Sequence, residues 1–312
     1  MYYFIVNVSA RTGKAAAIWD EVKQVLKNRG VDYKAYKTQG EAHATRLARE
    51  ITSRTEGETT LIVVGGDGTI NEVINGICDF SKVRFGFIPT GSGNDLGRGF
   101  GISVSPKEMM ERILDDKECM EMDLGLVTMA DTGASRYFAI SSGIGLDAYV
   151  CEKSLTSKAK KVLNSMGLGK LTYVLLTLCS LFSMHKAKLS VTVDDEKPVV
   201  INQMIFAAAM NHVYEGGGVP MAPAAKADDG YLSMCMVYGY NSITALFALP
   251  SLLAGKHQKK KGFWLVNCKK CVISIDKPMT VHTDGEVTLN EIKVTFSILP
   301  GALKILGVSS EK

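Results

Sequence analysis

The first ninety residues of this chain alternate between short apolar runs and stretches whose apolar residues recur with helical spacing. The predicted strands are Tyr2–Val8, Val31–Tyr36, Leu61–Val64 and Phe85–Ile88, and the predicted helices are Ala15–Lys27, Glu41–Ile51 and Ile70–Ile77. Such alternation is typical of βαβ units around a parallel sheet. Because the crossovers of these units are right-handed, the loops after the strands share one edge, where ligands bind. We therefore expect a Rossmann-like parallel α/β domain.

The pattern changes near Leu124, after which glycines and β-rich segments dominate. A chain of 312 residues exceeds the size of about 250–300 residues at which a single core stops growing, so two domains are expected. We predict an α/β domain over residues 1–125, completed by 299–312, and a mostly antiparallel β-sandwich domain over 126–298. The predicted strands of the second domain are Tyr137–Ser141, Leu189–Val193, Ile201–Met210, Tyr231–Val237, Cys271–Ile275 and Ile292–Ile298, and its predicted helices are Lys158–His185 and Ser242–Leu253.

The most informative motif is the turn GGDGTINE, Gly65–Glu72, between a predicted buried strand and a helix. Its glycines let the backbone turn tightly and approach a ligand closely. The N–H groups at the start of the following helix favour an anion such as phosphate. Asp67 would contact phosphate poorly by itself, which favours a bridging Mg²⁺ or activation of a hydroxyl. An ordinary strand-to-helix turn would explain the glycines but not the Asp or the Asn-Glu pair.

A second glycine-rich turn, PTGSGNDLGR at Pro89–Arg98, follows the next predicted strand. Thr90 and Ser92 carry hydroxyls that can bind phosphate oxygens. Asn94 or Asp95 is expected to cap the next helix, and capping alone would account for both residues. Two such turns on successive strands would flank a single cleft.

These two turns, together with Gly216–Gly218, Asp228–Gly230 and Asp284–Glu286, occur in the order seen in the diacylglycerol kinase catalytic-domain family. The chain resembles the soluble bacterial lipid kinases of the diacylglycerol kinase B and YegS type over nearly its whole length. The resemblance implies ATP-dependent transfer of the γ-phosphate to a lipid hydroxyl, assisted by Mg²⁺, in a cleft between the domains. Diacylglycerol is the leading acceptor, with phosphatidic acid as product and a place in phospholipid biosynthesis.

The resemblance also implies which residues catalyse the transfer and which bind Mg²⁺ and ATP. Glu286 would take the proton from the lipid hydroxyl, with Asp67 as the other candidate catalytic acid. A structural Mg²⁺ would be held by Lys226 and Tyr231 through their carbonyls and by Asp229 through its carboxylate, with Asp95 and Asp123 in its water network. The residues implied to bind ATP are Asn7, Val8, Ser9, Ala10, Arg11, Thr38, Gly65, Gly66, Asp67, Gly68, Thr69, Ile70, Asn71, Glu72, Thr90, Gly91, Ser92 and Asn94.

The cysteines and histidines show no pattern of metal ligands. Cys268 and Cys271 form one CxxC pair, but no second pair completes a zinc site, so buried structural thiols are expected. His212 and His282 lie near the supposed cleft, where satisfied structural histidines are the simpler interpretation. Seven cysteines and the absence of a visible signal peptide favour a reducing cytoplasm.

The net charge of the chain and two clusters of lysines indicate which kinds of partner it could bind. A net charge of +4 does not argue for nucleic acid, and the apolar stretch Leu171–Met184 is shorter than the roughly 20 residues of a spanning helix. Any single lysine is typical of a solvated face. Beside apolar helices, however, the clusters together favour peripheral contact with an anionic bilayer at the inner face of the membrane. The clusters are Lys153, Lys158, Lys160, Lys161 and Lys170, and Lys256, Lys259, Lys260 and Lys261.

Other functions remain open at this point. The acceptor could be phosphatidylglycerol, sphingosine or ceramide, or a soluble nicotinamide dinucleotide as in the NAD kinases, which share the GGDGT turn. A protein of a different class, a catalytically silent nucleotide-binding membrane sensor, would require loss of the acids, yet Asp67, Glu72 and Glu286 are all present. The sequence leaves the oligomeric state open, with a homodimer as an alternative.

Overall fold

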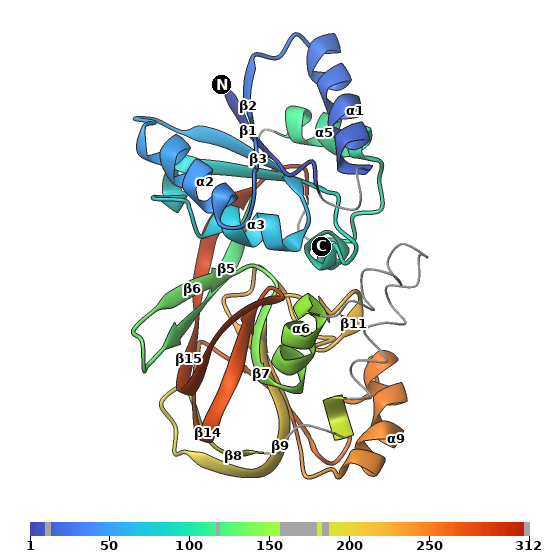
Figure 1. Cartoon of the computed structure of the whole chain (residues 1–312), viewed down its shortest axis with the longest axis vertical. Helices are drawn as coiled ribbons and strands as arrows, with labels where there is room; N and C mark the ends of the chain where they lie inside the picture. Colours follow the sequence, from blue (N-terminus) through green and yellow to red (C-terminus); the bar gives the residue numbers. More distant parts are fainter. Residues whose placement is uncertain (10–13, 117–118, 157–179, 183–186, 309–312) are drawn as a thin grey trace. The chain divides into compact units, whose positions relative to one another are not determined.

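A computed structural model describes residues 1–9, 14–116, 119–156, 180–182 and 187–308 (Figure 1). The chain divides into two compact units, residues 1–124 with 300–312 and residues 125–299. Two strands, β5 (Met120–Met129) and β15 (Glu286–Ile305), continue from one unit into the other.

Unit 1 is a parallel α/β sheet with the strand order β4-β3-β1-β2. The end of β15 adds to the β4 edge, where Lys304 pairs with Arg84 and Ile305 with Phe85. Its other elements are β1 (Tyr2–Val6), α1 (Lys14–Asn28), β2 (Tyr33–Lys37), α2 (His43–Ser53), β3 (Thr59–Gly65), α3 (Asp67–Ile74), the 3-10 turn η2 (Phe80–Lys82), β4 (Val83–Pro89), α4 (Asp95–Gly99) and α5 (Pro106–Asp115).

The central strands of unit 1 are buried on both faces, as expected for a parallel sheet covered by helices. Phe4 and Val6 point toward α1 and α5, where they pack against Trp19, Val22 and Ile113. On the other face, α2 and α3 pack against each other and contact β1 and β3. Helix α5 is absent from the sequence prediction, although Ser105 caps it by accepting a hydrogen bond from the Glu108 N–H (3.1 Å). That N-cap signal was readable in the sequence.

Unit 2 is antiparallel, which confirms the predicted character of the second domain. Its strand order is β13-β12-β9-β7-β14-β15, and β8 pairs with both β9 and β14. Its elements are β6 (Ser135–Phe138), β7 (Ser141–Gly145), α6 (Leu146–Thr156), β8 (Ala187–Val193), β9 (Val199–Met210), β10 (Tyr214–Glu215), β11 (Val219–Pro220), β12 (Leu232–Tyr238), α9 (Ser242–Leu253), β13 (Phe263–Cys268) and β14 (Lys270–Thr283).

The predicted strand Tyr137–Ser141 is wrong in one respect, since the chain forms two strands there. Strand β6 ends at Phe138 and β7 begins at Ser141. The backbone N–H groups of Ala139, Ile140 and Ser141 donate to the Asp284 carboxylate, which interrupts a continuous strand. Of the predicted helix Lys158–His185 only residues 180–182 are described, and they are helical; the rest lies outside the described residues.

Candidate active site

The GGDGT motif of unit 1 forms the first turn of a helix rather than a loop. Strand β3 ends at Gly65, Gly66 is the N-cap in extended conformation, and α3 begins at Asp67, three residues before the predicted start. A Cβ on Gly65 would lie 2.7 Å from the Thr69 Cβ, so only glycine fits there. The tight turn leaves the first N–H groups of α3 without intrahelical acceptors, as at any helix start, and such groups can bind phosphate.

The second glycine turn lies directly against the first. The Thr90 N–H donates to the Gly65 carbonyl (2.8 Å), which extends the pairing of β3 with β4. A Cβ on Gly91 would lie 2.8 Å from the Gly66 Cα, and one on Gly66 would lie 3.1 Å from the Gly91 Cα. The two backbones therefore touch at glycines because a side chain on either residue would force them apart. Thr90 is buried, and its hydroxyl has no hydrogen-bond partner among the described residues.

The residues that follow β1 join the same edge. The Asn7 Nδ2 donates to Thr69 Oγ1 (2.9 Å), and the Asn7 Oδ1 accepts from the Ser9 N–H (3.2 Å). Thr38, directly after β2, donates its N–H to the Val6 carbonyl (2.9 Å). The structure thus collects Asn7, Thr38 and both glycine turns at the carboxyl ends of the parallel strands, where such folds bind ligands. Ala10 and Arg11 lie outside the described residues.

Asp67 caps helix α4 from the neighbouring turn. Its carboxylate accepts hydrogen bonds from the N–H groups of Asp95 (3.1 Å) and Leu96 (3.5 Å). Asn94 occupies the N-cap position of α4 as expected, but the capping carboxylate comes from Asp67. Asn94 has a left-handed backbone (φ 50°) and makes no cap hydrogen bond, because its side-chain oxygen is turned toward Gly91 instead. Asp67 ties the two turns together, which sequence reasoning missed.

Glu72 also has a structural contact that the sequence did not reveal. Its Oε2 accepts from the Ala44 N–H (3.1 Å) at the start of α2, and its carbonyl accepts from Thr45 Oγ1 (2.8 Å). Ile70 and Asn71 are buried within α3. That Ile70, Asn71 and Glu72 bind ATP stays a prediction.

The predicted acids of the metal network lie in unit 1. Asp95 is buried and pairs with Arg98 (3.3 Å), which also donates to the Gly93 carbonyl (2.9 Å). Asp123 is buried and accepts from the Gly301 N–H (2.7 Å). A cavity of about 520 Å³ opens beside the second turn, and its lining includes Ser92, Asn94, Arg98, Ile102 and Met109.

In unit 2, the Asp-Gly-Glu motif forms a two-residue β-hairpin turn. Thr283 pairs with Glu286 across the turn, and Asp284 (φ 49°) and Gly285 (φ 85°) both have left-handed backbones. Asp and Gly are the residues that tolerate this conformation. Glu286 is thereby the first residue of β15 and is half-buried.

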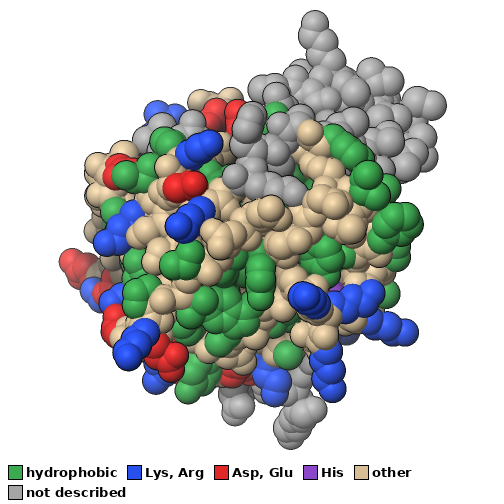
Figure 2. All heavy atoms as spheres, turned by 90° about the horizontal axis from the view of Figure 1, so that it is seen from below, with side chains coloured by type: hydrophobic (Ala, Val, Ile, Leu, Met, Phe, Trp, Pro, Cys, Tyr) green, Lys and Arg blue, Asp and Glu red, His purple; other side chains and the backbone are tan. Residues whose placement is uncertain are grey.

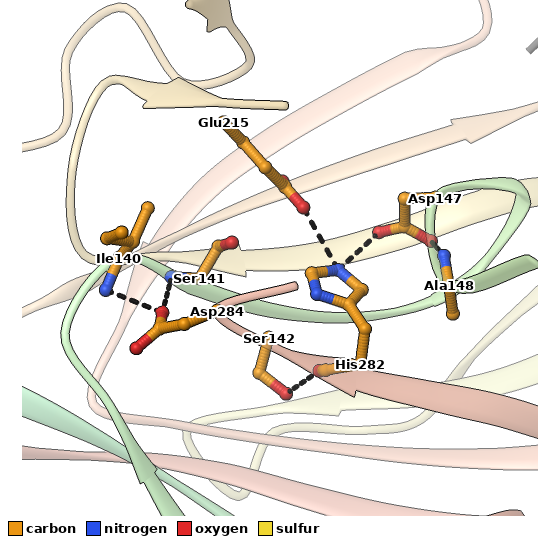
Figure 3. Close-up of polar contacts among 8 residues, drawn as sticks. All are labelled: Ile140, Ser141, Ser142, Asp147, Ala148, Glu215, His282 and Asp284. Carbon is orange, nitrogen blue, oxygen red and sulfur yellow. Dashed lines mark hydrogen bonds and ion pairs between the residues drawn. The ribbon is translucent and has the colours of Figure 1, made fainter. Parts of the chain in front are cut away.

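The Asp284 side chain holds this hairpin in place (Figure 3). Its carboxylate accepts three backbone hydrogen bonds, from Ala139 (2.9 Å), Ile140 (2.8 Å) and Ser141 (2.9 Å). Its own N–H donates to the Ser141 carbonyl (2.8 Å). Because these groups are buried, Asp284 fixes the start of β7 against the turn that carries Glu286.

His282, two residues before Asp284, lies between two acids that sequence reasoning did not connect. Its Nε2 is 3.1 Å from Asp147 Oδ2 and 3.0 Å from Glu215 Oε1 (Figure 3). Burial lowers the pKa of His282, but the charges of Glu215 and Asp147 outweigh it, so the pKa lies well above its ordinary value. The three residues are far apart in the chain, and no local spacing could have revealed them. His212, by contrast, is buried, and desolvation lowers its pKa to about 4.

The predicted structural Mg²⁺ site lies on an exposed turn of unit 2. Asp229 Oδ1 accepts from the Tyr231 N–H (3.0 Å), and Lys226, Asp229 and Tyr231 are all exposed. One carboxylate and two backbone carbonyls form an oxygen donor set that suits Mg²⁺.

The cysteines that the structure describes are all free thiols, and Cys268 and Cys271 are buried. The hydrogen bond with Cys268, then burial, raises the pKa of the Cys271 thiol, as expected for a structural residue.

Comparisons with known proteins identify the family of the chain. The family profile of the diacylglycerol kinase catalytic domain matches residues 1–127, and that of the YegS C-terminal NAD kinase beta sandwich-like domain matches residues 142–307. The Bacillus subtilis protein named "Putative lipid kinase YtlR" is 30% identical over 290 residues, covering 92% of this chain and 93% of the relative. This chain belongs to the diacylglycerol kinase and YegS family. It is a lipid kinase, and a kinase uses ATP as its phosphate donor.

Other relatives of this lipid kinase are more distant. A diacylglycerol kinase of Mycobacterium tuberculosis is 24% identical over 284 residues, covering 90% of this chain and 86% of the relative. A Bacillus anthracis crystal structure named as a diacylglycerol kinase shares the fold, with a TM-score of 0.66 at 19% identity, covering 98% and 96% of the two chains. An Archaeoglobus fulgidus NAD kinase solved in complex with ATP has a TM-score of 0.54 at 11% identity, covering 100% and 95%. Among the helices of the kinase that the structure describes, none has the length and apolar content needed to span a membrane.

Proposed function

We propose that this lipid kinase phosphorylates diacylglycerol. The lipid hydroxyl oxygen forms a bond to the γ-phosphorus of ATP, and the bond from that phosphorus to the β,γ-bridging oxygen breaks. Glu286 accepts the hydroxyl proton, ADP leaves, and the product is phosphatidic acid. Phosphoryl transfer requires mainly positioning and charge stabilisation from a protein, which suits a rigid pair of glycine turns.

The observation that carries the proposal is the backbone contact between Gly66 and Gly91. It joins the start of α3, whose first N–H groups have no intrahelical acceptors, to Thr90 and Ser92, whose hydroxyls are hydrogen-bond donors for phosphate oxygens. Mg²⁺ bound to ATP would supply charge neutralisation at the β- and γ-phosphates. The oxygen donors Lys226, Asp229 and Tyr231 would hold the structural Mg²⁺, with Asp95 and Asp123 in its water network. The remaining residues implied to bind ATP keep that role in the proposal.

We expect labelled ATP to transfer its γ-phosphate to diacylglycerol faster than to phosphatidylglycerol, sphingosine, ceramide, NAD or simple soluble alcohols. The assay presents each acceptor separately in mixed micelles, or in solution for the soluble ones, and counts labelled product. Gly91→Val is the matched control, because its side chain would press against Gly66 and should abolish transfer to every acceptor. Faster labelling of another lipid would contradict diacylglycerol as the acceptor but not the lipid kinase activity. Labelling of NAD alone would overturn the proposal.

The acceptor lies in a bilayer, and α9 supports contact with one. Its inner side buries Ala248 and Leu252 against the sheet of unit 2, yet its outer side exposes Ile243 (62%), Phe247 (76%) and Leu253 (47%). A helix that is apolar on both sides calls for a second apolar partner. Lys256, Lys259, Lys260 and Lys261 follow directly and are exposed. Figure 2 shows hydrophobic and basic side chains near one another on the side where Figure 1 places α9. The lysine cluster at 153–170 lies almost wholly outside the described residues.

We expect Phe247→Asp to weaken binding to anionic vesicles about tenfold or more, since burying a Phe side chain contributes roughly 1.5–3 kcal/mol. Co-sedimentation with phosphatidylglycerol vesicles measures the bound fraction, and higher salt should reduce it because the lysines contribute electrostatically. Val200→Asp is the control, since Val200 is also exposed (55%) but lies on β9. Equal binding by the wild-type protein and Phe247→Asp would contradict docking through α9.

A further inference from the structure

Three side chains with metal-binding atoms converge at one buried point of unit 2. Asp147 comes from the first turn of α6, Glu215 from β10 and His282 from β14. One ligand atom from each lies within 4.8 Å of the other two, and the closest pairs are 3.0 and 3.1 Å apart. The His282 side chain is fully buried, and those of Asp147 and Glu215 are only 9% and 13% exposed.

Hydrogen bonding alone does not satisfy this cluster. The His282 Nε2 carries at most one proton, yet a carboxylate oxygen lies within hydrogen-bond distance on each of two sides. One further atom of the cluster, Glu215 Oε2, is buried without a hydrogen-bond partner among the described residues. Buried polar atoms are nearly always satisfied, so this cluster calls for an additional partner.

The charges are also out of balance. Within the described part of the chain, His282 is the ion-pair partner of both acids, and neither pairs with a lysine or an arginine. With both carboxyls ionised, even a protonated imidazolium leaves one negative charge in excess, and a buried excess charge is costly. Burial accordingly raises the pKa of Asp147, so the cluster favours taking up a proton or a metal cation. A divalent cation bound by two carboxylates and a neutral imidazole would bring the sum to zero.

The sheet leaves space for these atoms by placing a glycine opposite them. Gly143 in β7 pairs directly with His282 in β14. A Cβ on Gly143 would lie 2.2 Å from Asp147 Oδ2 and 3.0 Å from His282 Nε2. Any other residue at position 143 would occupy the place where the ligand atoms converge.

We propose that Asp147, Glu215 and His282 bind one divalent transition-metal ion, of which Zn²⁺ is the representative. One imidazole and two carboxylates are a donor set that Zn²⁺ accepts. Ligand atoms about 2.0–2.1 Å from a tetrahedral ion lie roughly 3.3–3.4 Å from each other, a little more than the 3.0 and 3.1 Å between His282 Nε2 and the two carboxylate oxygens. The ion would link α6, β10 and β14 just before the Asp284 hairpin. It differs from the proposed Mg²⁺ sites in its imidazole ligand, and the inference does not depend on the kinase assignment.

The test uses Co²⁺ as a spectroscopic substitute for Zn²⁺. The full-length protein is treated with a chelator, dialysed and titrated with CoCl₂. We expect visible d–d absorption that saturates at one equivalent per chain, without the ultraviolet sulfur-to-cobalt band that ligation by Cys268 and Cys271 would produce. Adding one equivalent of ZnCl₂ should remove the visible band and raise the midpoint of thermal unfolding.

Variants of the ligands separate this site from others. Glu215→Gln and His282→Gln should each weaken Co²⁺ binding by about 100-fold or more, since even partners of the ligands contribute 10–100-fold. Asp229→Asn, in the proposed Mg²⁺ site, should bind Co²⁺ as the wild-type protein does. If either ligand variant fails to fold, the wild-type protein still tests the proposal. It should bind one Co²⁺ per chain and show no sulfur-to-cobalt band. Folded wild-type protein that binds no stoichiometric Co²⁺, or ligand variants that bind it equally well, would overturn the proposal.

Discussion

Replacing Glu286 with Gln is expected to lower turnover about 10²–10⁴-fold, the usual contribution of a general base, and to leave ATP binding intact. Gln has nearly the shape of Glu but cannot accept the proton of an alcohol. Glu286 starts β15 directly after a turn anchored by Asp284, so the substitution should leave the hairpin unchanged. Single-turnover assays with diacylglycerol measure the chemical step, and titration calorimetry with a non-hydrolysable ATP analogue measures nucleotide binding.

The matched control is Glu196→Gln, which removes an exposed carboxylate of the same unit and should retain full activity. Asp67→Asn tests the competing candidate. It should weaken the cap on α4, since one of the oxygens that accept from Asp95 and Leu96 becomes an amide. Undiminished turnover in Glu286→Gln would transfer the role of base to Asp67.

Replacing Asp284 with Ala is expected to destabilise unit 2 by at least about 3 kcal/mol. The carboxylate accepts three buried backbone N–H groups, from Ala139, Ile140 and Ser141, and each would lose its acceptor. Ala would also be strained at φ 49°, where Asp is tolerated. Urea unfolding followed by tryptophan fluorescence gives the free energy of unfolding.

The two tryptophans allow each unit to be followed separately. Trp19 lies in α1 of unit 1 and Trp264 in β13 of unit 2. In a Trp19→Phe background the signal of Trp264 should show the full loss of stability. In a Trp264→Phe background the signal of Trp19 should change much less. Asp284→Asn, which tolerates the backbone and keeps one oxygen for Ile140 and Ser141, should lose clearly less stability than Asp284→Ala. Equal stability of Asp284→Ala and wild type would contradict the anchoring role.

Much of the fold could be predicted because its signals are local. Alternating apolar runs and helical periodicity placed β1 to β4 and α1 to α3 within a few residues, and Ser242–Leu253 was predicted as observed. Helix α5 was missed although its N-cap signal is local, but other errors occur where backbone groups bond to distant side chains. The strand predicted through Ala139 is interrupted by Asp284, more than a hundred positions away.

The candidate site divides in the same way. GGDGTINEV, GSGND and the late Asp-Gly-Glu carried the resemblance to the lipid kinases. The two glycine turns could be predicted from the sequence because turn conformation and phosphate binding depend on residue types at neighbouring positions. Only the tertiary structure decided that Asp67 caps α4, that Glu72 caps α2, and that His282 meets Asp147 and Glu215. Such contacts depend on strand register and on which turns meet in space, and neither is written in the spacing of residues along the chain.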